Sequence, residues 1–176
     1  MICKKQLYIT KYSIYYLLVL FLFANCSNKG EGNQESCFSN INAETIFHDG
    51  ENREYIIYIP SSYDETSNVP LMFNFHGFGG SANDYMNYAD MRTLAENEVF
   101  ILVYPQGSCL DGDSHWNPSL SGADNKSDAD DFGFIEGVIN KISSDYTIDR
   151  ERIYACGYSN GGMFAYGLAN FKSNLI

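Results

Sequence analysis

A serine flanked by glycines, in Gly157-Tyr-Ser-Asn-Gly161, is the segment with the clearest catalytic chemistry. Residues 152–156 before it predict a strand, and residues 161–170 after it predict a helix. A serine at such a sharp strand-to-helix turn has an exposed hydroxyl, and glycines on both sides let neighbouring backbone approach closely. The positive end of the following helix would point toward Ser159. The pattern therefore predicts Ser159 as the nucleophile of an acyl-transfer reaction.

A second glycine-rich segment, His76-Gly-Phe-Gly-Gly80, follows an apolar run at residues 70–75 that predicts a buried strand. Acyl transfer needs two backbone N–H groups directed at the developing oxyanion. Asn160 supplies one as the residue after the nucleophile, and the N–H of Phe78 is our candidate for the other. Either segment alone could be an ordinary turn, but both follow predicted strands in the order that this chemistry needs. The residues expected to shape the two turns are His76, Gly77, Gly79, Gly157 and Gly161.

Strands and helices alternate from about residue 45, which predicts an α/β fold with a parallel sheet between helices. The expected strands are 53–59, 70–75, 99–104 and 152–156, and the expected helices are 81–97, about 130–146 and 161–170. Asp128 or Asp130 can cap the middle helix. Residues 106–126 form a polar loop that carries the only tryptophan, Trp116.

The composition of the chain limits the classes of protein to which it can belong. The chain has 176 residues, of which 45% are hydrophobic and 15% aromatic, so it is long and apolar enough for one domain with a core. Its formal net charge of −11 repels phosphate backbones, which excludes nucleic acid as a partner. With only three histidines and no Cys-x-x-Cys pair, a structural zinc site is not expected, and nothing implies a metal or an organic cofactor.

The N-terminus has the pattern of an export signal. Lys4, Lys5 and Lys11 precede an apolar run at residues 14–24, which is too short for a membrane-spanning helix of roughly 20 residues. The run ends at Cys26 in a segment that is similar to a bacterial lipobox, which predicts a lipid anchor on that cysteine; simple cleavage and release is the alternative.

The predicted division of the chain follows from this leader. Residues 1–25 are expected to be a signal peptide, residues 26–44 a flexible tether, and residues 45–176 the N-terminal part of the catalytic domain. The protein is thus expected to be secreted or lipid-anchored to the cell envelope, with no other membrane contact. Cys37, Cys109 and Cys156 remain after processing and allow one disulfide and one free thiol, but the sequence does not choose the pair.

Several blocks in order resemble the polyhydroxybutyrate depolymerase-like esterases, a group with feruloyl and acetyl xylan esterases. The blocks are residues 70–80, 103–107, 116–117, 130–135 and 148–162, within a resemblance that spans about residues 45–172. The resemblance implies an α/β-hydrolase fold and a cofactor-free serine esterase with Ser159 as nucleophile and Phe78 and Asn160 as oxyanion donors. Its substrate would be an ester, such as a side group of a plant cell-wall polysaccharide or a polyester.

The resemblance also implies roles for Trp116, Asn117, His76 and Asp131, and the sequence context suggests roles for His115 and His48. Trp116 and Asn117 would lie on a loop near the site, where His115 could contact substrate. His76 would hold the glycine-rich loop, His48 would be a surface residue, and Asp131 would fix a helix start.

The sequence departs from the α/β-hydrolase pattern after the nucleophile. In this fold an acid and then a histidine follow the serine along the chain, but the residues after Ser159 contain neither. We therefore expect these residues to be the N-terminal part of an esterase, with a sheet truncated after the helix at 161–170 and no turnover of their own.

Two other functions remain open. A serine peptidase of the same fold would use the same nucleophile. A non-catalytic surface lipoprotein could instead keep the fold and bind a polysaccharide through tyrosine and tryptophan side chains.

Overall fold

The computed structural model describes residues 37, 40, 42–120 and 125–176. The predicted signal peptide, Cys26 and most of the tether lie outside the described residues. In the described part, no helix is both long and apolar enough to cross a membrane.

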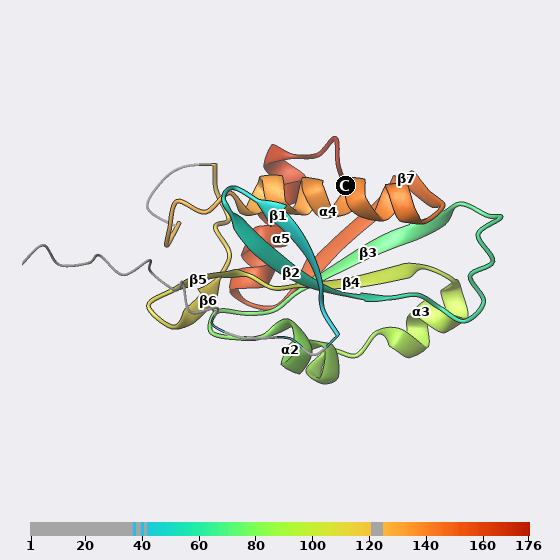
Figure 1. Cartoon of the computed structure of the whole chain (residues 1–176), viewed down its shortest axis with the longest axis horizontal. Coiled ribbons are helices and arrows are strands. Elements are labelled where there is room, and N and C mark those ends of the chain that lie inside the picture. Colours follow the sequence, from blue (N-terminus) through green and yellow to red (C-terminus); the bar gives the residue numbers. More distant parts are fainter. Residues whose placement is uncertain (1–36, 38–39, 41, 121–124) are drawn as a thin grey trace, which may run out of the picture. The chain divides into compact units, whose positions relative to one another are not determined.

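Five strands form one mixed sheet in the order β1-β2-β4-β3-β7 (Figure 1). Strand β2 pairs antiparallel with β1 and β4, whereas β3 pairs parallel with both β4 and β7. The strands are β1 (Glu44–His48), β2 (Glu51–Tyr58), β3 (Val69–Phe75), β4 (Ile101–Pro105) and β7 (Ile148–Gly157). The predicted α/β class is confirmed, and β1 is a strand that the sequence patterns did not predict.

Helices cover both faces of this sheet (Figure 1). They are α2 (Ala82–Tyr88) and α3 (Arg92–Glu98) on one face, and α4 (Asp131–Asp145) and α5 (Asn160–Phe171) on the other. Successive side chains of β4 point to opposite faces, so Ile101 and Val103 pack in the core under α4 and α5, while Leu102 and Tyr104 pack with α2 and α3. This double coverage explains why β4 is a continuous apolar run.

The helix predicted over residues 81–97 is in fact two helices. The chain breaks between α2 and α3 because the Tyr104 hydroxyl donates to Ala89 O at 2.8 Å and accepts from Met91 N at 3.1 Å. Asp90 also takes the N–H of Arg92 at 2.9 Å. A tyrosine on β4 thus decides a break that the local helix pattern does not show.

The predicted polar loop after β4 contains a small hairpin, β5 (Ser108–Leu110) and β6 (Asp113–His115). Its turn is Asp111-Gly112, where both residues have positive φ, 53° and 87°. Asp-Gly is the residue pair that such two-residue hairpin turns favour, so the sequence did carry this signal.

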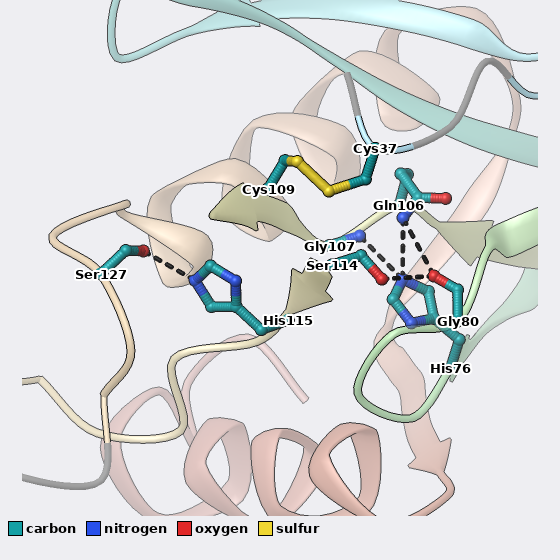
Figure 2. The surroundings of a disulfide bond; sticks show 9 residues. All are labelled: Cys37, His76, Gly80, Gln106, Gly107, Cys109, Ser114, His115 and Ser127. Atoms are coloured by element: carbon teal, nitrogen blue, oxygen red, sulfur yellow. Dashed lines mark hydrogen bonds between the residues drawn. A yellow bond between two sulfur atoms is a disulfide. The ribbon is translucent and has the colours of Figure 1, made fainter. Parts of the chain in front are cut away.

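A disulfide joins Cys37 to Cys109 on this hairpin (Figure 2). This is the pair that the sequence left open. Cys156 is the free thiol; its Sγ donates to Asn74 Oδ1 at 3.2 Å, and burial raises its pKa, so the thiol stays protonated.

Candidate active site

Ser159 occupies the turn between β7 and α5 in a backbone conformation that serine rarely adopts. Its φ is 51° and its ψ is −119°, and α5 begins at the next residue. A non-glycine residue held in such a region costs about 1–3 kcal/mol and is often found where strain serves function. We call residues 157–161 the serine turn.

The two outer glycines of the serine turn are sites of close backbone approach. A Cβ on Gly161 would lie 2.3 Å from Phe75 O and 2.4 Å from His76 O. A Cβ on Gly157 would lie 2.6 Å from Gly161 C and O. A side chain on Gly161 would push α5 away from the end of β3, and one on Gly157 would push α5 away from the end of β7, so both positions require glycine.

Residues 76–80, the oxyanion loop, lie directly against the serine turn. A Cβ on Gly77 would be 3.5 Å from Ser159 Cβ. Gly79 has a φ of 69° and donates its N–H to Ser114 O at 2.8 Å, and Gly80 N donates to Gly77 O at 3.1 Å. Among the described residues, neither Phe78 N nor Asn160 N has a hydrogen-bond acceptor. Both predicted oxyanion donors are therefore unused.

Hydrogen bonds of the buried His76 ring hold the oxyanion loop in place (Figure 2). Its Nε2 accepts from Gly107 N at 2.9 Å and lies 3.2 Å from the Gln106 amide, while its Nδ1 lies 2.7 Å from Gly77 O. Since Gly107 N must donate, Nε2 is the acceptor and Nδ1 carries the proton. Burial lowers the pKa of His76 to about 4, so the ring is neutral near pH 7.

Because of this burial, we expect stability to fall as the pH falls from about 6.5 to 4. The unfolded chain binds a proton on His76 near pH 6.5, whereas the folded protein binds it only near pH 4, so the free energy of unfolding decreases across this window. The loss is on the order of 3 kcal/mol. Urea unfolding at several pH values measures it, with His76→Gln as the comparison. Equal pH dependence of the two proteins would contradict the assignment.

The other two histidines also have partners away from Ser159. His115 is fully buried, its Nε2 lies 2.7 Å from Ser127 Oγ, and burial lowers its pKa (Figure 2). His48 Nε2 lies 3.2 Å from Asp130 Oδ2 at the start of α4. Within the described part of the chain, no histidine is hydrogen-bonded to Ser159.

The loop carrying His115, Trp116 and Asn117 lies beside the serine turn, but its side chains point inward. The exposed fractions of these residues are 0%, 0% and 2%. Contact between this loop and substrate therefore stays a prediction, which the burial of these side chains does not favour. The loop looked exposed because it is polar, but its polar groups find partners on α4 and α5.

A buried ion pair between Arg53 and Asp131 anchors that loop, and the sequence analysis did not identify Arg53 as a member of it. Arg53 Nη2 on β2 contacts Asp131 Oδ1 at 2.7 Å, and Asp131 Oδ2 accepts from Asn117 N at 2.8 Å. The cap of α4 is Asp130, as one of the two alternatives predicted, while Asp131 pairs with Arg53 instead of fixing the helix start. A single arginine on the same inward face as Tyr55 is the signal that could have revealed the pair.

Among the described residues, no cluster of histidine, cysteine and carboxylate side chains could hold a metal ion. The described site therefore offers a serine hydroxyl, two free backbone N–H donors and a neutral, fixed loop.

Comparison with known proteins identifies esterases as relatives of this chain. No protein-family model matches the chain. A bifunctional acetylxylan esterase/xylanase from Neocallimastix patriciarum is 32% identical over 127 residues, which is 72% of this chain and 17% of that protein. Feruloyl esterase B from Piromyces equi is 31% identical over 121 residues, 68% of this chain and 21% of the relative. The chain thus spans about a fifth of the length of these relatives.

Solved structures agree on the fold. An acetyl xylan esterase from Aspergillus awamori superimposes with a TM-score of 0.58 at 24% identity, covering 76% of this chain and 48% of that one. A ferulic acid esterase gives a TM-score of 0.60 at 19% identity, covering 76% and 53%. The relatives and the sheet with helices on both faces agree: the chain is homologous to part of the feruloyl and acetylxylan esterases and has the fold of the α/β-hydrolases.

Proposed function

We propose that this protein is an exported serine carboxylic ester hydrolase whose nucleophile is Ser159. The observation that carries the proposal is the strained serine at the start of α5, with the oxyanion loop packed against it and two unused N–H donors beside it. Such donors, fixed before the reaction, are the usual means of stabilising an acyl-transfer transition state.

In the proposed reaction, Ser159 Oγ attacks the ester carbonyl carbon and its proton passes to a base. The carbonyl oxygen becomes negative and accepts hydrogen bonds from Phe78 N and Asn160 N. The intermediate then expels the alcohol, and water releases the acid from the acyl-enzyme. No metal or organic cofactor takes part.

The base is not one of the three histidines, since each of them is held by other partners. The 176 residues thus supply the nucleophile and the donors without the acid and the base. We expect near-background turnover from these residues alone, because triad removal typically costs on the order of 10⁶-fold in kcat.

The substrate class follows from the relatives. Their names give feruloyl and acetylxylan esters, which supports an acyl ester on a plant cell-wall polysaccharide as the substrate here. A polyester is the other ester substrate in keeping with the sequence. The net charge of −11 argues against a nucleic-acid partner.

The alternative of a non-catalytic polysaccharide binder is weakened, because Trp116 is fully buried and its side chain is not available to contact a polysaccharide. Its remaining candidates are exposed tyrosines such as Tyr88 and Tyr166. A serine peptidase would use the same site geometry and differs only in substrate.

Export is supported by the basic and apolar leader and by the disulfide between Cys37 and Cys109, because such bonds persist in oxidising compartments. The lipid anchor on Cys26 remains part of the proposal, with release after cleavage as the alternative.

One experiment addresses all of these points. The natural protein that contains these residues is purified from its own cells, treated with a fluorophosphonate probe, and analysed by intact and peptide mass spectrometry. We expect label on Ser159, preference for acetyl or feruloyl esters over peptides, and a diacylglyceryl group on Cys26. Retention on polysaccharide without label favours the binder, faster peptide cleavage favours the peptidase, and an intact Met1 contradicts export.

A further inference from the structure

Trp116 is hydrogen-bonded to both halves of the oxyanion site. Its indole N–H donates to His76 O at 3.1 Å, at the start of the oxyanion loop. Its backbone N donates to Asn160 Oδ1 at 2.7 Å, and Asn160 Nδ2 donates back to Trp116 O at 2.9 Å. All three residues are buried, so no water competes for these bonds. The side chains of Trp116 and Asn160 have no part in the reaction steps described above.

The two contacts act on the backbone that carries the donors. His76 O belongs to the peptide that leads into Gly77 and Phe78, so a bond to it restrains the direction of the loop. The paired bonds to the Asn160 amide fix a side chain whose own backbone N–H is the second donor. A single residue therefore connects the peptide groups on either side of the developing oxyanion.

The position of Trp116 is itself fixed by its neighbours, so the residue can hold His76 and Asn160 in place. Its ring centroid lies 4.9 Å from that of Phe164 on α5 and 5.1 Å from that of Phe75 at the end of β3. The next residue, Asn117, donates its N–H to Asp131, whose carboxylate is paired with Arg53. The indole is thus fixed by the core, by α4 and by β2 together.

We propose that Trp116, with the Asn160 side chain, is a positioning residue that sets the spacing of the Phe78 and Asn160 N–H groups. This inference rests on the proposed function, because it concerns the same site. Oxyanion donors act only when they lie about 2.7–3.1 Å from the oxygen, and a shift of about 1 Å can cost roughly 10²-fold in rate. Fixing both donors through one buried side chain keeps that spacing constant.

Two variants of the natural protein break the connection at different points. Trp116→Phe keeps an aromatic ring against Phe75 and Phe164 but removes the donor to His76 O. Asn160→Ala keeps the backbone N–H but removes both bonds to Trp116. We expect kcat for an acetyl or feruloyl ester to fall about 10-fold in the first and about 10²-fold in the second, with KM changed less than about twofold.

Tyr104→Phe is the matched control, because it removes a buried hydroxyl with two hydrogen bonds on the opposite face of the sheet. We expect it to lower the melting temperature as much as the other variants do and to leave kcat unchanged. If Trp116 and Asn160 were merely structural, all three variants would lose stability and keep the kcat of the wild type.

A second measurement does not depend on turnover. In the NMR spectrum of the ¹⁵N-labelled protein, Asn160→Ala should shift the amide resonance of Phe78, whereas Tyr104→Phe should not. The positioning role of Trp116 is overturned if the Phe78 amide resonance does not move and if Trp116→Phe and Asn160→Ala both keep the kcat of the wild type. In that case, a loss of activity in Ser159→Ala would still support the esterase proposal. Activity retained in Ser159→Ala overturns the esterase proposal, and the Phe78 resonance then decides the connection alone.

Discussion

Replacing Ser159 with alanine in the natural protein is expected to lower kcat for ester hydrolysis by about 10⁴-fold or more. The variant keeps the unused N–H donors of Phe78 and Asn160 and the packing of the serine turn, so substrate can still bind. It lacks the oxygen that forms the acyl-enzyme, and only the catalysis due to binding and the oxyanion donors remains. Steady-state hydrolysis of 4-nitrophenyl acetate and of a feruloyl ester measures the loss.

Ser61→Ala is the control. Ser61 is an exposed serine, its hydroxyl donates a hydrogen bond to the Glu96 carboxylate, and it lies in a segment of the chain remote in sequence from the serine turn. It should match the wild type in kcat and KM. Ser159→Ala with a kcat within tenfold of the wild type would remove Ser159 from the reaction and, with it, the esterase mechanism.

The second large effect is on stability, at Asp131. Asp131→Ala is expected to lower the free energy of unfolding by about 4 kcal/mol, because the buried Arg53 guanidinium loses its close, fully buried counter-charge and keeps only the partly exposed Glu51 carboxylate, 3.7 Å away. It also removes the acceptor for Ser108 Oγ and for Asn117 N, two further buried donors. Urea denaturation followed by circular dichroism measures the change.

The neighbouring carboxylate supplies a matched control. Asp130 is exposed and caps α4 by accepting from Gly133 N at 2.9 Å, so Asp130→Ala should cost only about 1 kcal/mol. The double change Arg53→Met with Asp131→Leu removes both charges and should recover much of the loss. Equal effects of Asp130→Ala and Asp131→Ala would show that the buried pair contributes no more than an ordinary helix cap.

The sequence by itself determined the class of fold and the kind of site. Apolar runs at 70–75 and 99–104 fixed the two central strands, because a strand covered on both faces must be apolar throughout. Glycines at the ends of predicted strands identified the oxyanion loop and the serine turn, since only glycine permits the close approach found at Gly157 and Gly161. These features depend on local geometry, which neighbouring residues encode.

The tertiary structure decided which distant residues meet. Arg53 and Asp131 are 78 positions apart, Cys37 and Cys109 are 72 apart, and Trp116 and Asn160 are 44 apart. No local pattern selects such partners, because a polar residue is equally compatible with solvent or with a buried acceptor until the elements pack. For this reason the sequence placed Trp116 on a polar loop, whereas packing against α5 buried it in contact with His76 and Asn160.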